Sequence, residues 1–364
     1  MKKYLQIVLS LLIPFGLVSQ NLRLVTNLPS HLNENSGLVA TSSNGVWTHN
    51  DSGDGPILYK IDSNGIQIDS IFLNGVSAID FEDVAQDNLG NFYIGDFGNN
   101  NHNRTNLVIY KIPNPDSIMG NNVTPEAIYF SYPNQVTFPD TNQDKDCEAL
   151  FHYNGNLFLL SKNWGNSGYS TLYQLPDSAG TYSAIIIDSV QTPLVTGADI
   201  HSSGKLAVLS MDRVVIFDQF SGNNFFNGRK STFLFSLTQK EGVTFVDANK
   251  LYISQENHRF FPGAKLYELN FSSFLSTISI ARSPDMQAMP NPANESLMIS
   301  LQNLETIPSK LKYEVYNMNG QLVMSNQFNF QSEFVIFLSE LNKGMYLIKL
   351  TLDEYSITKR FIKN

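Results

Sequence analysis

The feature that most constrains the fold is a short motif that recurs five times between Asn21 and about Phe271. Each copy joins an acidic, small or hydroxyl residue to an aliphatic residue within two positions. The five copies are Ser36-Gly37-Leu38, Glu82-Asp83-Val84, Glu148-Ala149-Leu150, Ala198-Asp199-Ile200 and Glu241-Gly242-Val243. Their first positions are separated by 46, 66, 50 and 43 residues. This spacing admits one four-stranded sheet per copy, which is the period of a β-propeller blade.

Further strand patterns follow each copy of the motif at similar distances and alternate apolar with polar residues. Second strands are expected at 46–52, 92–97, 157–163, 206–212 and 251–257, and third strands at 58–62, 109–113, 172–176, 215–219 and 266–270. Fourth strands are expected near 67–73, 126–132, 183–190 and 230–237, and the fifth unit lacks one. We expect the strand-like segment 21–29 to complete the fifth blade and close the ring. The count favours five blades, with six as the alternative because the 66-residue interval has room for another blade.

Composition limits the class of partner. The chain has 24 basic and 33 acidic residues and a net charge of −9, which argues against nucleic acid and anionic membranes. Hydrophobic residues make up 42% of the chain, enough for a sizeable core. The single cysteine, Cys147, excludes an intramolecular disulfide and a thiolate zinc site, and we expect it to be a small buried core residue.

The N-terminal segment 1–19 has Lys2 and Lys3, a short apolar stretch from Tyr4 to Val18 and a small residue, Ser19, near its end. This pattern is typical of a secretory signal peptide. No later segment approaches 18 consecutive apolar residues, so the mature chain is expected to be exported and to have no transmembrane span.

The chain changes character at about Met289. The segment 311–323 has two strand patterns around Asn319-Gly320, a dipeptide that favours a hairpin, and 341–350 and 356–364 supply two more strands. We therefore expect an all-β chain with a propeller over 20–282, a linker over 283–289 and a small C-terminal β-sandwich over 290–364.

The C-terminal motifs carry a resemblance. The opening Pro290-Asn291-Pro292-Ala293, the hairpin, the turn 341–346 and the basic end 359–363 resemble the type A C-terminal sorting domain of the type IX (Por) secretion system of Bacteroidetes. The resemblance implies that the type IX secretion machinery handles this domain, which would place the protein outside the cell, either released or on the surface. The alternative is an accessory sandwich that binds a ligand.

The central region also resembles a family. The segments 34–38 and 80–85, together with Asp96-Phe97-Gly98-Asn99-Asn100, look like the SdiA-regulated family, a calcium-binding propeller that is distantly similar to NHL-repeat proteins. Phe81 and Asp83 replace the usual Trp and Gly of the second opening.

Acidic residues recur at one position of the repeat, on strands that would line the central channel. Glu82, Glu148 and Glu241 share that position, and Asp80 and Asp146 precede two of them by two residues. Carboxylates gathered in a confined space repel one another unless a cation joins them or some stay protonated. Calcium prefers hard oxygen ligands, so we expect a calcium site. The predicted ligands are Glu82, Asp96, Glu148 and Glu241, with Asp51 and Asn99 as further candidates. The alternative is that these acids only accept hydrogen bonds from backbone amides.

Two functions follow from this arrangement, and the sequence leaves open whether the protein is an enzyme. The first is binding of an extracellular protein or glycan at the top of the ring, where the long loops 98–106 and 134–146 are expected. The second is a calcium-dependent hydrolase of a lactone, phosphoester or glycoside, with His49 as the candidate base for the first two. The sequence has no nucleophile elbow, phosphate-binding loop or dinucleotide-binding fingerprint.

Overall fold

The computed structural model describes residues 22–41, 45–140, 144–164, 168–192, 194–272, 285–302, 310–318, 320–352 and 355–364. The predicted signal peptide, 1–19, lies outside these residues. The chain divides into two compact units, 1–271 and 272–364, which are described separately. Among the described residues, no helix has both the length and the apolar character needed to cross a membrane.

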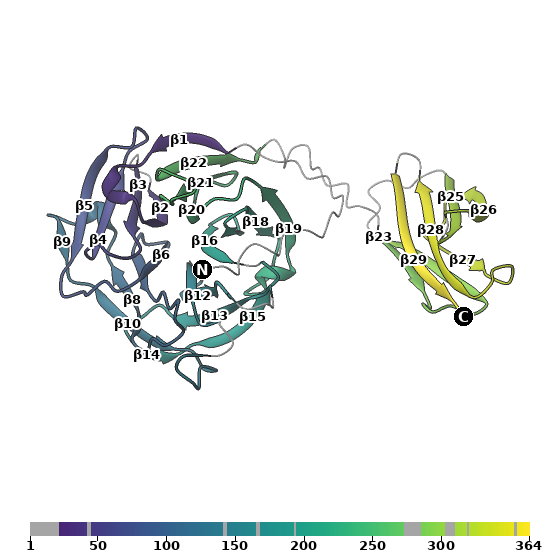
Figure 1. Ribbon diagram of the computed structural model, residues 1–364, viewed down its shortest axis with the longest axis horizontal. Coiled ribbons are helices and arrows are strands. Elements are labelled where there is room, and N and C mark those ends of the chain that lie inside the picture. Colours follow the sequence, from purple (N-terminus) through teal and green to yellow (C-terminus); the bar gives the residue numbers. More distant parts are fainter. Residues whose placement is uncertain are drawn as a thin grey trace. The chain divides into compact units, whose positions relative to one another are not determined.

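The described residues of the first unit form five sheets whose main strands are antiparallel, as expected for a propeller (Figure 1). The first holds β2 (Asn35–Thr41), β3 (Gly45–Asn50), β4 (Ile57–Ile61) and β5 (Gln67–Leu73), and the second holds β6 (Phe81–Gln86), β7 (Phe92–Asp96), β8 (Leu107–Ile112) and β10 (Glu126–Ser131). The third holds β11 (Cys147–Tyr153), β12 (Asn156–Ser161), β13 (Ser170–Pro176) and β15 (Ile185–Val190), and the fourth holds β16 (Val195–His201), β17 (Lys205–Ser210), β18 (Arg213–Asp218) and β19 (Arg229–Leu234). The fifth holds β20 (Lys240–Asp247), β21 (Lys250–Gln255), β22 (Lys265–Asn270) and β1 (Arg23–Asn27).

The inner strands contact one another in a closed cycle. Each of β2, β6, β11, β16 and β20 ends its sheet and packs against the next in that order, and β20 packs against β2 (Figure 1). Strand β1, from the start of the chain, pairs with β22, the third strand of the last sheet. The two ends of this unit are thereby joined in one sheet, as the sequence predicts, and the closed ring leaves no open edge between first and last blades.

Two short strands add a feature that the sequence analysis missed. Strand β9 (Asn122–Val123) leaves the second sheet and pairs in parallel with β5 of the first. Strand β14 (Gly180–Ser183) likewise leaves the third sheet and pairs in parallel with β10 of the second. Each short strand covers the outer edge of the preceding sheet, so part of the long interval between the second and third motifs fastens neighbouring sheets together.

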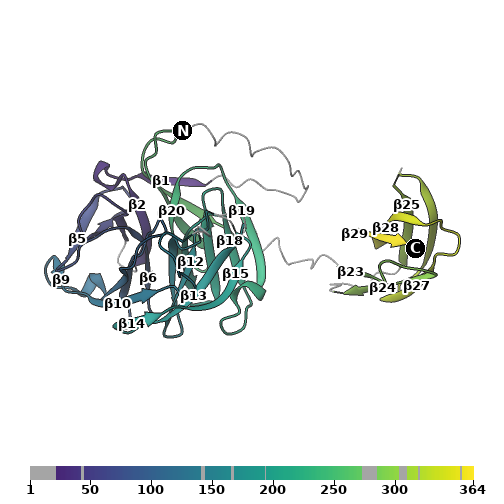
Figure 2. The same ribbon diagram turned by 60° about the horizontal axis from the view of Figure 1, so that its bottom comes forward.

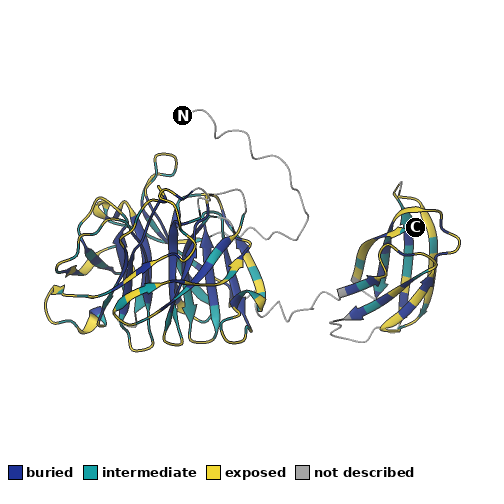
Figure 3. Ribbon diagram, turned by 90° about the horizontal axis from the view of Figure 1, so that it is seen from below, coloured by how far each residue is buried: buried dark blue, intermediate teal, exposed yellow. Residues whose placement is uncertain are grey.

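The apolar core of this unit lies between neighbouring sheets. The cluster between the first and second sheets includes Trp47, Leu58, Ile71, Phe92 and Ile94, all fully or almost fully buried. Similar clusters join the second sheet to the third and the third to the fourth, and Figure 3 shows buried residues along the strands of this unit. Cys147 is a free, fully buried thiol in the second of these clusters, which confirms its predicted role as a core residue.

The register of the fourth sheet differs from the prediction. Every inner strand has a bulge near its start, and in four sheets the bulge contains the first residue of the predicted motif. In the fourth sheet the bulge lies between Val195 and Gly197, so the equivalent motif is Thr196-Gly197-Ala198. The predicted copy, Ala198-Asp199-Ile200, is displaced by two residues. The alternation of a strand repeats every two residues, so a shift by two leaves the apolar pattern unchanged.

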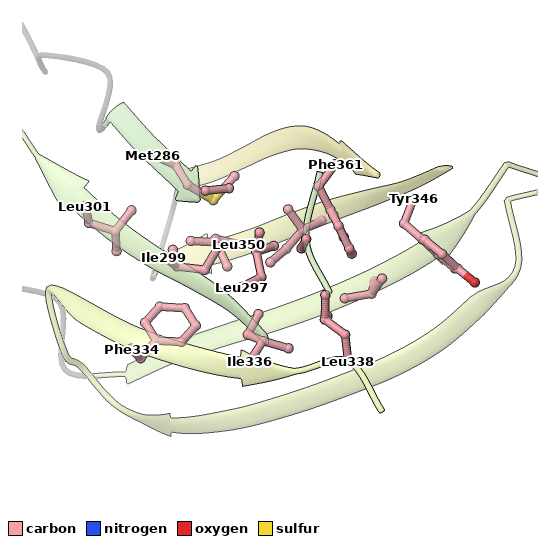
Figure 4. Close-up of a cluster of buried hydrophobic side chains, with 14 of the residues drawn as sticks. Met286, Leu297, Ile299, Leu301, Phe334, Ile336, Leu338, Tyr346, Leu350 and Phe361 are labelled. Carbon is pink, nitrogen blue, oxygen red and sulfur yellow. The ribbon is translucent and has the colours of Figure 1, made fainter. Parts of the chain in front are cut away.

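The second unit is a two-sheet sandwich with its own core (Figures 2 and 4). One sheet holds β23 (Asp285–Met289), β24 (Ser296–Gln302) and β27 (Glu333–Phe337), and the other holds β25 (Lys310–Asn317), β26 (Leu322–Asn329), β28 (Gly344–Leu352) and β29 (Tyr355–Lys363). Strands β25 and β26 form the predicted hairpin. Residues 285–289 were expected in a linker, but they form β23 because Met286 and Ala288 alternate inward and pack in the core (Figure 4).

Candidate cation site at the axis of the ring

The candidate site is built at the bulges of the inner strands. The five residues that share this bulged position are Ser36, Glu82, Glu148, Thr196 and Glu241. A bulge re-aims a side chain relative to the regular ladder. All five residues are buried at the start of the strands nearest the axis, and the Ser36 hydroxyl donates to the backbone oxygen of Glu82 in the next sheet. Three carboxyls and two hydroxyls therefore share one level of the ring.

Glu82 and Glu148 converge with Asp146. One carboxylate oxygen from each lies within 4.8 Å of the others, and all three residues are buried. Gly98 makes this approach possible, because a Cβ at that position would lie 2.1 Å from Glu82 Oε1 and 2.5 Å from Asp80 Oδ2. The sequence analysis placed Glu82 and Glu148 in one site but did not include Asp146 among the ligands.

Lys162 is the basic residue within this group, and the sequence analysis missed it. It directly follows β12, and its Nζ lies 3.1 Å from Glu148 Oε1 and 4.9 Å from the centre of the Trp164 ring. Its backbone nitrogen donates to the backbone carbonyl oxygen of Asp146 at 2.7 Å. We call Glu82, Asp146, Glu148, Glu241 and Lys162 the axial cluster.

Burial and mutual repulsion control the protonation of the axial cluster. Burial, with repulsion from Glu148 and Asp146, raises the pKa of Glu82 well above its usual range. Burial also raises the pKa of Glu148 well above its usual range, although Lys162 opposes the shift. Burial raises the pKa of Glu241 to about 7, again against the effect of Lys162. Burial favours a lower pKa for Lys162, but Glu148, Glu241 and Glu82 outweigh this effect and raise its pKa. The ammonium therefore stays charged among carboxyls that resist ionisation.

Other buried carboxylates on the inner strands have a different role. Asp83 Oδ2 accepts hydrogen bonds from Leu150 N at 2.8 Å and Ala198 N at 3.2 Å, in the third and fourth sheets. Asp199 Oδ2 accepts from Phe245 N of the fifth sheet at 2.7 Å. These two residues staple neighbouring sheets together, which is the hydrogen-bonding role considered above as the alternative to metal binding.

Asp96, the fourth predicted calcium ligand, is already engaged. Its carboxylate accepts from Ile79 N and Asp80 N, and Oδ1 also lies 2.9 Å from Arg104 Nη2. The structure groups neither Asp96 nor Glu241 with the converging oxygens of Glu82, Asp146 and Glu148. Asn99 supports the cluster indirectly, since its backbone nitrogen donates to Asp146 Oδ1 at 2.6 Å.

Asp51 belongs to a second acidic group, with Glu34 and Glu256. Burial, with repulsion from Glu241 and Asp51, raises the pKa of Glu256 to about 8. The candidate base His49 is fully buried, packs edge-on against Phe81 and has its pKa lowered to about 4 by burial. It is therefore neutral at pH 7 and inaccessible to solvent in this structure.

The longest loops lie at the same end of the ring as the axial cluster. The connections from second to third strands begin at this end because successive antiparallel strands reverse direction. Loop residues 97–106 and 132–140 pack together there, with Asp140 N donating to His102 O at 2.9 Å. Trp164, 42% exposed, donates from Nε1 to Asp146 Oδ2 at 2.6 Å and so connects the cluster to the surface. Phe138 and Phe260 are exposed on two other connections of this unit.

The second unit matches a known family. Residues 287–364 match the secretion system C-terminal sorting domain, the domain that addresses proteins to the type IX machinery. The match covers the sandwich and confirms the resemblance found in the sequence. The chain is therefore an exported protein that is handled by this machinery and is secreted or attached to the cell surface.

Comparison with solved structures gives propeller-like but distant neighbours. A gluconolactonase from Xanthomonas campestris has a TM-score of 0.36 and 14% identity, with 64% of this chain and 71% of that chain covered. The extracellular domain of a putative hybrid two-component system from B. thetaiotaomicron has a TM-score of 0.36 and 11% identity, with 95% and 60% covered. A quinonprotein alcohol dehydrogenase-like protein from Bacteroides thetaiotaomicron has a TM-score of 0.32 and 10% identity, with 84% and 69% covered. No curated protein matches the chain. Likeness at this level transfers no ligand or activity.

Proposed function

We propose that this protein is an exported binding propeller that uses a calcium ion at the axial cluster to hold an extracellular protein or glycan. The observation that carries the proposal is the convergence of the Glu82, Asp146 and Glu148 oxygens within 4.8 Å. Calcium takes six to eight oxygen ligands at 2.3–2.6 Å, so oxygens at this spacing fit one ion. When bound, the ion would oppose the effects of burial and of carboxyl repulsion, which together raise the pKa of Glu82 and Glu148.

The surrounding loops supply the surface for the ligand. Trp164, Phe138 and Phe260 are exposed aromatic side chains on three different connections. Aromatic rings stack on sugars and are favoured anchors in protein interfaces. Trp164 also contacts Asp146, so an ion held by Asp146 would order the part of the surface that receives the ligand.

The calcium proposal is tested by thermal unfolding of the wild type, Glu82→Gln and Glu148→Gln in excess calcium and in chelator. Calcium at 100 times its dissociation constant stabilises the folded state by about 2.7 kcal/mol, so the wild-type melting temperature should rise. Both substitutions should abolish the rise, whereas Asp188→Asn on the outer strand β15 should keep it. A wild-type melting temperature that is the same in calcium and in chelator would refute the ion site.

The ligand is sought with purified glycans and extracellular proteins in the same two buffers. Binding that requires calcium and is lost in Trp164→Ala would support the proposal. Binding that is equal in both buffers would show that the ligand surface does not depend on the ion.

A calcium-dependent hydrolase of a lactone, phosphoester or glycoside is the second candidate. The observation in its favour is the pKa of Glu241, about 7, because a general acid or base works best when its pKa is near the operating pH. Turnover of chromogenic substrates that depends on calcium and is lost in Glu241→Gln would favour it. The burial of His49 argues against the base predicted from the sequence.

A further inference from the structure

We infer that Lys162 is an internal counter-ion of the axial cluster that competes with a bound divalent cation and thereby sets the calcium affinity of the site. This inference rests on the proposed calcium site and adds a residue that controls it. Lys162 Nζ already forms the charge contact that an external cation would make, at 3.1 Å from Glu148 Oε1. An oxygen that accepts from an ammonium has less electron density to offer a metal ion, so the two cations compete for Glu148.

The position of Lys162 is fixed by its surroundings. Its side chain is only 7% exposed, its backbone nitrogen donates to the oxygen of Asp146, and its ammonium lies against the face of Trp164. A lysine held in this way loses little further conformational entropy when it pairs with Glu148. It is therefore a preorganised competitor rather than a mobile surface charge.

The charges of the axial cluster do not balance with Lys162 alone. The ammonium pairs with Glu148, and the carboxyls of Glu82, Asp146 and Glu241 also act on it electrostatically, so four carboxyl groups share one lysine. When ionised they leave an excess of three negative charges, which a single divalent ion would reduce to one. Lys162 therefore offsets only part of the charge that these carboxyls carry when ionised, and the remaining negative charge can attract a divalent cation.

A buried threonine hydroxyl at this level of the ring is a further candidate ligand for the ion. Thr196 occupies in the fourth sheet the bulged position that Glu148 and Glu241 occupy in the third and fifth. The residue is 1% exposed, and its Oγ1 has no hydrogen-bond partner among the described residues. A buried polar group without a partner in a native structure calls for an explanation, and a bound ion or water at that place is one. Thr196 would supply a neutral oxygen between the two glutamates.

The test is calcium titration of the full protein by calorimetry, combined with thermal unfolding in chelator. Lys162→Met keeps an apolar chain against Trp164 but removes the charge. We expect its calcium affinity to rise at least tenfold and its melting temperature in chelator to fall, because the carboxyls then lack any counter-ion. Lys162→Arg keeps the charge and should bind calcium no more tightly than the wild type.

Lys111→Met is the matched control. Lys111 also lies over an aromatic ring, with its Nζ 5.2 Å from the centre of Tyr93, but it contacts the Asp177 backbone rather than the axial cluster. Its substitution should leave calcium affinity within twofold of the wild type. In a Glu148→Gln background, removal of Lys162 should change any residual affinity much less, because the contested oxygen is no longer a carboxylate.

The outcomes separate the inference from the proposal on which it rests. Calcium binding by the wild type with equal affinity in Lys162→Met would overturn the inference and leave the ion site intact. Absence of calcium binding in the wild type and in Lys162→Met would overturn both. If Lys162→Met does not fold, Lys162→Gln provides the same comparison with a side chain that can still donate a hydrogen bond to Glu148.

Discussion

Two sets of buried carboxylates lie on the inner strands, yet only one of them has the properties of a site. Asp83 and Asp199 receive backbone N–H groups from neighbouring sheets. Glu82 and Glu148 instead face other carboxyls and Lys162. Burial raises the pKa of both sets, so burial alone does not distinguish them. The hydrogen-bond donors make the difference. A carboxylate that accepts from fixed backbone amides has its partners already, whereas carboxyls that face one another can still bind a cation.

The largest effect is expected from Asp83→Ala. The substitution leaves the backbone nitrogens of Leu150 and Ala198 without an acceptor in the interior, and each such orphan costs about 1–3 kcal/mol. We expect a loss of roughly 3–5 kcal/mol in the free energy of unfolding, measured by urea denaturation.

The control is Asp188→Ala, because among the described residues Asp188 accepts only from the neighbouring Ser189 nitrogen on an outer strand. Its cost should stay below about 1 kcal/mol. A similar small cost for Asp83→Ala would contradict the stapling role, whatever calcium does at the axial cluster.

The sequence predicts most of the ring because each sheet repeats an alternation that depends only on local residues. The joining of β1 to the last sheet also follows, since a missing strand and a spare strand are both visible in the sequence. The parallel pairing of β9 and β14 does not follow, because two or four residues carry too little pattern to specify a partner.

The site is predicted only in part, for a related reason. Glu82 and Glu148 share a repeat position and are found by comparing the motifs. Lys162 is missed because a lysine just after a strand is usually solvated. The signal was nevertheless present, since Asp51, Lys162 and Glu256 occupy one position after the second strands of three sheets. Asp96 and Asp83 show why the roles of the acids could not be predicted. An aspartate that accepts hydrogen bonds from backbone amides cannot be told by residue type from one that binds a metal.

The next largest effect has the opposite sign, because removal of a cluster carboxyl should stabilise the protein. Glu241→Gln replaces a buried carboxyl whose pKa is raised to about 7 with a neutral amide. At pH 8 in chelator we expect the variant to be more stable than the wild type by about 1–3 kcal/mol, because ionisation of this group opposes folding. Urea denaturation at pH 8 measures the change. A destabilised variant would show that Glu241 is held by donors, like Asp83.

The pH dependence in chelator should have the same origin. The pKa of Glu241 is about 7 and that of Glu256 about 8, both above the usual 4.5, so between pH 6.5 and 8 the folded state binds more protons than the unfolded state. The free energy of unfolding should therefore fall by about 1–2 kcal/mol as the pH rises through this range. His49, with a pKa lowered to about 4 by burial, destabilises the folded state mainly below pH 6.5, where the unfolded chain binds its proton, and does not reverse the trend. Stability that rises with pH in chelator would contradict it.

The smallest effect tests how the axial cluster is joined to the surface. Trp164→Phe keeps an aromatic ring near Lys162 but removes the donor to Asp146 Oδ2. We expect a loss of about 1 kcal/mol in chelator, since Trp164 is partly exposed and water can replace part of the bond. Calcium should reverse most of this loss if the ion binds the Asp146 carboxylate in place of the Trp164 donor. An equal loss in both buffers would mean that the Trp164 bond is only structural, and Asp146 would then resemble Asp83 more than Glu82.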